Sequence, residues 1–169
     1  TLTDIIVGGP SYMSIAVDIT GKASHAGMEP EKGVSAIKAA AHAISMLKEG
    51  WVDEETTTNV GVIRGGEVIN AVPEKAEIKV ECRSQSHENC LKRSDLIKQI
   101  FLNAAESLGA RAEIAMELLV KCYSISEDTD SVVIAKKAIR QVGLDPEARV
   151  ICGGTDAAIY NEKGIETVV

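Results

Sequence analysis

Three segments of the chain alternate apolar and polar residues with the two-residue period of a β-strand that buries one face. They lie at residues 13–19, 76–83 and 112–118. A fourth segment, residues 57–64, is rich in Thr and Val, and it ends at the Gly65–Gly66 pair, which is typical of a turn. The sequence therefore predicts four strands within the first 120 residues.

Apolar residues at helical spacing follow the first and the third of these strands. In the first helix Pro30 marks the start, Gly50 the end, and the apolar positions between them are Val34, Ile37, Ala41 and Ile44. The second helix is capped by Ser86 and stopped by Gly109, and its apolar stripe is Cys90, Ile97, Phe101, Ala104 and Leu108.

The resulting order, β-α-β-β-α-β, predicts an α+β fold of the ferredoxin-like kind, with one four-stranded antiparallel sheet and two helices on one face. We place this domain at residues 11–122. From Asp128 onward the pattern changes to a helix, a short strand at residues 149–152, a Gly-Gly turn, a second helix and a further strand. Residues 123–169 are therefore expected to be part of an α/β domain, and residues 1–10 the end of an earlier segment of it, so that the chain is a piece of a longer protein.

Composition narrows the range of functions. Aromatic residues make up 3% of the chain and the net charge is −7, with the 18 Lys and Arg residues scattered, which argues against a nucleic-acid partner. The spacings of the four cysteines, Cys82, Cys90, Cys122 and Cys152, do not match those of zinc sites. We expect reduced thiols, no membrane segment and a cytoplasmic location.

Four local features are candidates for chemistry, and each also has an ordinary structural explanation. His25 lies in the small-residue loop GKASHAG, where an imidazole is either merely solvated or free to act on a ligand. Asn70 either caps a turn or contacts a ligand, and Arg83, on the polar face of its strand, either does nothing specific or grips a carboxylate. Gly153, Gly154, Thr155 and Asp156 follow a strand and open a helix, where an anion could sit, or where Thr155 or Asp156 simply serves as N-cap.

Taken together, these motifs resemble one family. GKASHAG, MEPEKGVSAI, NVGVIRGGEVINAVPEKAEIKVECRS and GGTDA occur in the order found in zinc-dependent exopeptidases of the peptidase T type, relatives of carboxypeptidase G, aminoacylase and succinyl-diaminopimelate desuccinylase. The resemblance covers almost the entire chain. It implies a catalytic α/β domain with two zinc ions, interrupted by a ferredoxin-like lid that often forms a homodimer.

The resemblance also implies roles for single residues. His25 matches the lid histidine that reaches the partner subunit's active site and stabilises the oxyanion formed from the scissile carbonyl. Asn70 and Arg83 match a lid pair that binds the substrate carboxylate or amide. Gly153, Gly154 and Thr155 match a loop lining the substrate pocket, and Asp156 matches the helix start beside it. The family's metal ligands and its general-base Glu have no match in these 169 residues, so the chain alone is expected to bind no catalytic zinc.

Two hypotheses from different classes remain. In the first, the chain is the lid and part of the catalytic domain of a zinc aminopeptidase that cleaves short peptides, or within the same family an aminoacylase or other deacylase. In the second, it is a non-catalytic module for dimerisation or small-molecule binding, because this fold hosts many such domains.

Overall fold

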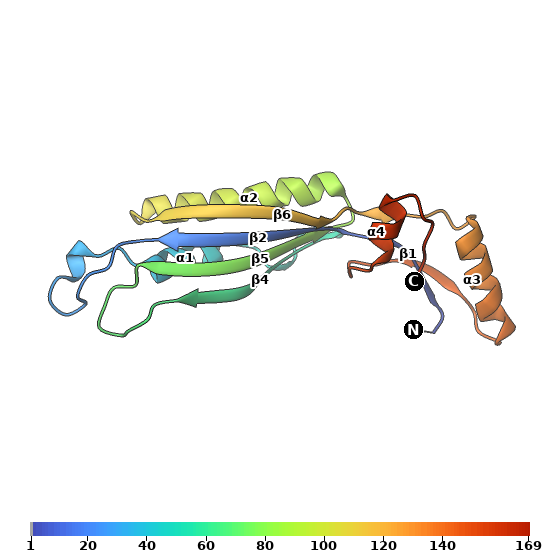
Figure 1. The fold of residues 1–169 in the computed structure, drawn as a ribbon, viewed down its shortest axis with the longest axis horizontal. Helices are drawn as coiled ribbons and strands as arrows, with labels where there is room; N and C mark the ends of the chain where they lie inside the picture. The colour runs from blue at the N-terminus through green and yellow to red at the C-terminus, as the bar shows by residue number, and fades with distance from the viewer. Residues whose placement is uncertain (1) are drawn as a thin grey trace.

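The computed structural model describes residues 2–169; Thr1, the first residue of the predicted segment 1–10, lies outside the described residues. The molecule is elongated, with a large sheet along most of its length and a small sheet at one end (Figure 1). The strands are β1 (Asp4–Gly9), β2 (Ser11–Thr20), β3 (Gly50–Trp51), β4 (Thr56–Gly65), β5 (Lys75–Ser84), β6 (Arg111–Val120), β7 (Tyr123–Ser124) and β8 (Glu147–Val150). The helices are α1 (Ala36–Met46), α2 (His87–Ser107), α3 (Asp130–Gln141) and α4 (Ala157–Glu162), with a short 3-10 turn at Pro30–Lys32.

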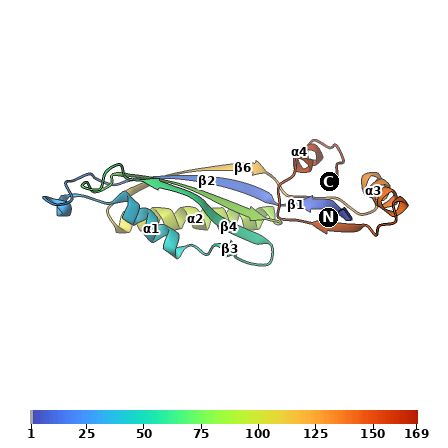
Figure 2. The same cartoon turned by 90° about the horizontal axis from the view of Figure 1, so that it is seen from below.

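The large sheet confirms the predicted α+β fold. Its strand order is β3-β4-β5-β2-β6 and every pairing in it is antiparallel. The four predicted strands are β2, β4, β5 and β6, and the two-residue strand β3 adds a short fifth member beside the start of β4. Helices α1 and α2 lie on the same face of this sheet (Figure 2).

The main hydrophobic core lies between that face and the two helices. Alternate residues of β2 and β5 point into it, as the two-residue period predicts. From α2 the core receives Cys90, Ile97, Phe101 and Ala104, as predicted, and the Oγ of Ser86 accepts a hydrogen bond from the backbone N of Asn89 at 3.3 Å as the helix N-cap. Gly109 has a φ of 74°, the left-handed conformation in which glycine commonly ends a helix.

The prediction for the first helix was wrong in both bounds and in its buried face: α1 ends at Met46, and Gly50, the predicted end, belongs to β3. Pro30 opens only the 3-10 turn, and α1 begins at Ala36 with the Oγ of Ser35 accepting a hydrogen bond from the N of Lys38. The buried face of α1 consists of alanines, whereas Ile37 is 38% exposed. Small side chains let the helix pack closely on the sheet, so alanines rather than Ile37 mark the inner face, although the predicted Ile44 is half-buried and packs against the same core. The buried residues of α1 are Ala36, Ala39, Ala40 and Ala43.

The small sheet has the order β7-β1-β8, with β1 and β8 parallel and β7 antiparallel to β1. Strand β1 was not predicted, although Ile5 and Val7 form a second small core with Val132 of α3. Strand β8 ends at Val150, two residues before the predicted limit. The predicted final strand is not assigned as one, but Val169 exchanges backbone hydrogen bonds with Ile6. Within residues 2–169, no helix is both long and apolar enough to cross a membrane.

Candidate functional site

His25 and Asn70 lie on two loops that are joined at the end of the large sheet away from the small sheet. His25 forms an isolated antiparallel bridge with Ala71. The bridge is closed by hydrogen bonds from the N of Ala26 to the O of Asn70, at 3.0 Å, and from the N of Val72 to the O of Ser24, at 2.9 Å. His25 and Asn70 both reach solvent, and the Nδ1 of His25 accepts a hydrogen bond from the N of Gly27 at 3.2 Å. We call this unit, residues 21–33 and 66–74, the distal tip.

Close backbone packing holds the distal tip together. A Cβ atom at Gly33 would lie 2.3 Å from the Oγ of Ser24 and 2.9 Å from the Cβ of Val72, so only glycine fits between the two loops. The base of the tip is fixed by hydrogen bonds between Gly21 and Glu74, and between Ala36 and Pro73. The His25 imidazole is thus presented to solvent from a backbone that its neighbours hold in place.

Arg83 lies at the other end of the same sheet, where β5 pairs with the beginning of β2. Its Cζ is 4.2 Å from the ring centroid of Tyr12, and its Nη2 donates to the Oε2 of Glu81 at 3.0 Å. Its Nη1 donates to the carbonyl O of Cys152 at 3.4 Å, so the side chain links the two sheets. The Nε of Arg83 is buried and has no hydrogen-bond acceptor among the described residues.

The segment Gly153–Asp156 follows β8 and leads into α4, as predicted. Gly153, Gly154 and Asp156 are exposed, and the Oγ1 of Thr155 lies 3.2 Å from the Oη of Tyr123. Asp156 occupies the N-cap position of α4 without a side-chain capping bond. The hydrogen bond from Arg83 to Cys152 places this segment directly beside the guanidinium. We call Arg83 and residues 153–156 together the proximal cluster.

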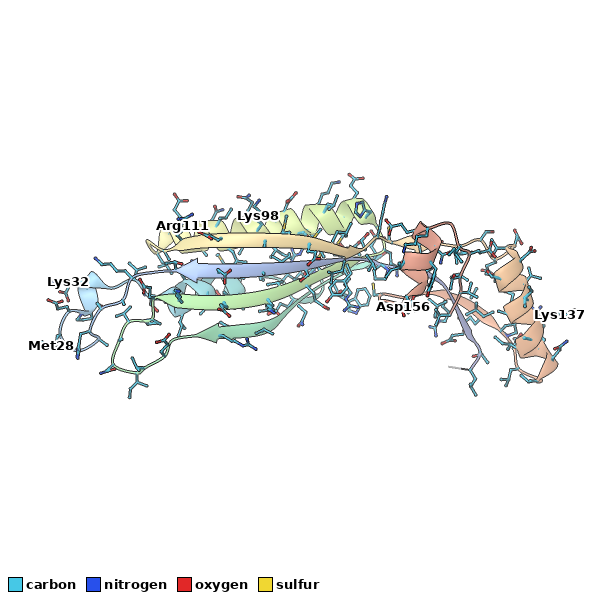
Figure 3. All side chains as sticks on the ribbon, in the orientation of Figure 1. Met28, Lys32, Lys98, Arg111, Lys137 and Asp156 are labelled. Carbon is cyan, nitrogen blue, oxygen red and sulfur yellow. The ribbon has the colours of Figure 1, made fainter. Side chains whose placement is uncertain are left out.

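The structure therefore separates the predicted site residues into two groups within one chain. Figure 3 shows Met28, in the distal tip, and Asp156, in the proximal cluster, at the two ends of the large sheet. Asn70 and Arg83, predicted to act as a pair, belong to different groups because most of β5 lies between them. The sequence contained this signal, since the third predicted strand occupies more than half of the interval between the two residues.

Sequence reasoning missed three side chains around the proximal cluster: Tyr12, Glu81 and Tyr123. Tyr12 and Glu81 each lie directly beside Arg83 on the sheet, because Tyr12 is its cross-strand partner and Glu81 is two residues earlier in β5. Both could have been found from the alternation, which puts them on the same face as Arg83.

The environment of this cluster affects two titratable groups. Burial works against the charged form of Arg83, but the hydrogen bond and charge of Glu81, with a smaller effect from Tyr12, raise the pKa of Arg83. Burial also raises the pKa of the Cys152 thiol, an effect that a hydrogen bond with Gln85 and the charge of Arg83 only partly offset. At neutral pH Arg83 is thus a fixed cation, and the neighbouring Cys152 is a protonated thiol.

The arrangement of acidic, histidine and cysteine side chains does not fit a metal centre. Across residues 2–169, no three His, Cys, Asp or Glu side chains gather in a way that could hold a metal ion. The residues described by the structure therefore do not form a zinc site.

Comparison with known proteins places the chain in a family. Residues 8–108 match the M20 model described as the peptidase dimerisation domain. The crystal structure of a tripeptidase from Staphylococcus aureus superposes with a TM-score of 0.92 at 36% identity, and that of the aminopeptidase PepT from Bacillus cereus with a TM-score of 0.88 at 34% identity. Each match covers 98% of this chain and 44% of the other.

Curated sequences agree with this assignment. The uncharacterised protein YqjE of Bacillus subtilis is 39% identical over 165 residues, which is 98% of this chain and 44% of that protein. A p-aminobenzoyl-glutamate hydrolase component of Escherichia coli is 34% identical over 118 residues, 64% of this chain and 26% of that protein. The chain thus spans less than half the length of these relatives. It belongs to the M20 peptidase family and contains that family's dimerisation domain.

Proposed function

We propose that the full-length protein is a homodimeric, cytoplasmic zinc aminopeptidase of the tripeptidase type, which hydrolyses an amide bond of short peptides. The similarity to the tripeptidase of Staphylococcus aureus and to the aminopeptidase of Bacillus cereus supports the substrate class. The two zinc ions are inferred from the family resemblance, and their ligands would come from parts of the protein outside this chain.

The observation that carries the proposal is the separation of the distal tip from the proximal cluster. A peptide of two or three residues is roughly 10 Å long, whereas a ten-residue strand such as β5 extends about 33 Å. One chain therefore does not bring His25 and Arg83 to the same short peptide. A dimer with a two-fold axis presents each tip to the partner's cluster, which completes two equivalent sites.

In this arrangement each group has a distinct task. The proximal cluster binds the peptide, with Arg83 facing its carboxylate and Gly153–Asp156 lining the pocket. His25 of the partner subunit donates a hydrogen bond to the carbonyl oxygen as negative charge develops on it, and Asn70 of the partner subunit contacts the substrate amide. The position of His25 on a fixed backbone is suited to this, because little reorganisation is needed at the moment of reaction.

We assign the interface between the two subunits of the dimer to the edge formed by β4 and α1. Ile37 of α1 and Ile63 of β4 are 38% and 51% exposed, and Trp51 of β3 on the same edge is 58% exposed. The first half of the β4 edge is covered by β3 and by the carboxylate of Glu49, which accepts a hydrogen bond from the N of Val60. The second half, residues 62–65, is free to pair with the same strand of a second copy.

The test is an assay of the full-length protein on tripeptides, dipeptides and N-acylated amino acids, each with and without His25→Ala. The proposal expects the highest kcat/KM on tripeptides and a large loss with His25→Ala on that substrate. A preference for acylated amino acids would make the protein a deacylase, a reaction class suggested by the 28% identity to the acetylornithine deacetylase of Myxococcus xanthus. Absence of turnover with all substrates, at full zinc occupancy, would favour a non-catalytic module.

A further inference from the structure

The side chain of Arg83 is held on three sides before any ligand is bound. Tyr12 is its direct partner across the β2–β5 pair, so the ring and the guanidinium lie on the same face of the sheet. The 4.2 Å separation between Cζ and the ring centroid is that of a cation–π contact. The contact fixes the plane of the guanidinium against the sheet.

Glu81 fixes the direction of the group within that plane. Its Oε2 accepts from the Nη2 of Arg83 at 3.0 Å, and the side chains of Glu81 and Arg83 are only 31% and 23% exposed. A charge-assisted hydrogen bond that is largely shielded from water is more directional than one on an open surface. The carbonyl of Cys152 then holds Nη1 from the other sheet.

These contacts leave one buried donor without an acceptor. The Nε–H of Arg83 has no hydrogen-bond partner in the part of the chain that the structure describes. An unpaired buried N–H is unfavourable and calls for an explanation, and a donor kept for a ligand oxygen is one such explanation. Since a guanidinium offers its N–H groups as a rigid fork, Nε–H and a neighbouring Nη–H can grip a carboxylate in a bidentate manner.

We propose that Tyr12 and Glu81 are positioning residues that hold Arg83 ready for the C-terminal carboxylate of the peptide substrate. The inference rests on the proposed function, but it concerns substrate binding by this chain's own residues. It predicts that selectivity for a free carboxylate over an amide depends on an aromatic ring at position 12 and on the acceptor at position 81.

The experiment compares a tripeptide with its C-terminal amide as substrates of the full-length protein. With Tyr12→Leu we expect KM for the free tripeptide to rise about tenfold while kcat stays within about twofold, and the already weaker activity on the amide to change little. Tyr12→Phe keeps the ring and should restore KM to within about twofold of the unmodified protein. Glu81→Gln keeps an acceptor but removes the charge, so a smaller rise of about threefold is expected.

A purely structural role for the three residues predicts another pattern. The positioning role is overturned if Tyr12→Leu and Glu81→Gln lower kcat/KM equally for the free tripeptide and the amide. It is also overturned if Tyr12→Phe behaves like Tyr12→Leu. Thermal unfolding of each variant shows whether it is folded, and Tyr12→Phe and Glu81→Gln keep the inference testable if Tyr12→Leu is not.

A binding measurement separates this inference from the proposed function. Isothermal titration calorimetry of trialanine binding to the zinc-loaded His25→Ala protein measures Kd without requiring turnover. The Kd should rise about tenfold when Tyr12→Leu is added, and about threefold with Glu81→Gln. If these Kd changes are found but the protein with His25 intact hydrolyses no peptide, the peptidase proposal is refuted and the Arg83 site is kept. Unchanged Kd values, together with peptidase activity of the protein with His25 intact, would refute the Arg83 inference and keep the peptidase proposal.

Discussion

His25 and Arg83 lie at opposite ends of the same antiparallel sheet. Arg83 pairs with Tyr12 near the start of β2, and His25 follows Thr20, at the end of that strand, by five residues. Successive residues of a strand advance about 3.3 Å, so the eight steps from Tyr12 to Thr20 alone separate the two positions by about 26 Å. Two residues proposed to act on one small substrate must therefore come from two subunits.

Mixing two inactive variants tests this directly. In a heterodimer of His25→Ala and Arg83→Ala subunits, one site combines the intact Arg83 of the first with the intact His25 of the second. Random exchange of equal amounts makes half of the dimers mixed, each with one intact site, so about one quarter of the original activity should return. The measurement is tripeptidase activity after the two proteins are mixed under conditions in which subunits exchange.

If His25 and Arg83 of the same subunit formed the site, every site in the mixture would lack one of them and no activity would return. Mass spectrometry with one isotope-labelled variant verifies that heterodimers have formed. Recovery below a few per cent in a verified mixture would rule out a site shared between subunits.

His25→Ala in the homodimer tests the oxyanion role. Removing one oxyanion donor lowers kcat by about 100- to 1,000-fold in enzymes where this has been measured. We expect a loss of that size here, with little change in thermal unfolding because the imidazole is not part of the core. Lys32→Ala is the matched control: Lys32 lies on the same loop, and its ion pair with Glu29 is exposed, so its removal should leave activity intact. A His25→Ala protein that retained full kcat/KM on the best peptide would remove His25 from the chemistry.

The parts of the fold that the sequence predicts well are those with a strict period. β2 and β5 bury every second residue, and the buried stripe of α2 is apolar at every position except Ser94, whose Oγ donates to the O of Cys90 within the helix. In α1 the inner face is made of alanine, a residue that is common on any face of a helix and so does not identify the buried one. Ile37, which the helical spacing predicted to be buried, is exposed and does not belong to the core. An exposed isoleucine on the edge of a dimerisation domain is better explained by a second subunit.

The site residues were predicted from sequence motifs, and a motif does not say how far apart its residues lie in the folded protein. The spacing of thirteen residues between Asn70 and Arg83 looks short in sequence, yet most of it is an extended strand. Conversely, Arg83 and Cys152 are 69 residues apart and are hydrogen-bonded, because β8 and the loop after it return to the end of β5. Such contacts depend on how the two sheets meet, which no local period encodes.

A charge introduced on the β4 edge tests the proposed interface between the two subunits. Ile63→Lys introduces a cation that would be buried against its symmetry mate, at a cost that weakens or abolishes the dimer. Light scattering coupled to size-exclusion chromatography should show monomer at micromolar concentration, with loss of peptidase activity. Leu96→Lys is the matched control, because Leu96 is similarly exposed (49%) on α2, away from this edge. Dimerisation unaffected by Ile63→Lys but lost with Leu96→Lys would move the interface to the α2 side.

Phe101→Ala tests the core of the large sheet. Phe101 is fully buried between α2 and the sheet and is the largest of the fully buried side chains among the described residues. Truncating such a residue removes apolar contacts and leaves a cavity, which costs about 3–5 kcal/mol of unfolding free energy. Urea unfolding followed by circular dichroism measures the change, with the exposed Leu96→Ala expected to cost less than about 1 kcal/mol. A similar midpoint for both variants would mean that the helix is not packed as described.

Alkylation of Cys152 reports on the proximal cluster and has a predicted pH dependence. Burial raises the pKa of this thiol above its ordinary value, so the unfolded chain releases the proton at lower pH than the folded one. The neutral thiol therefore contributes to stability below about pH 9, and this contribution is lost as the pH rises through the folded-state pKa.

The thiolate is also the reactive form, so iodoacetamide should modify Cys152 more slowly at about pH 8 than it modifies a cysteine in an unfolded peptide. Peptide mapping by mass spectrometry follows the reaction, with Cys152→Ser identifying the modified site. Because the carbonyl of Cys152 accepts from Arg83, a bound tripeptide should slow the modification further, and equal rates with and without the peptide would place the substrate elsewhere.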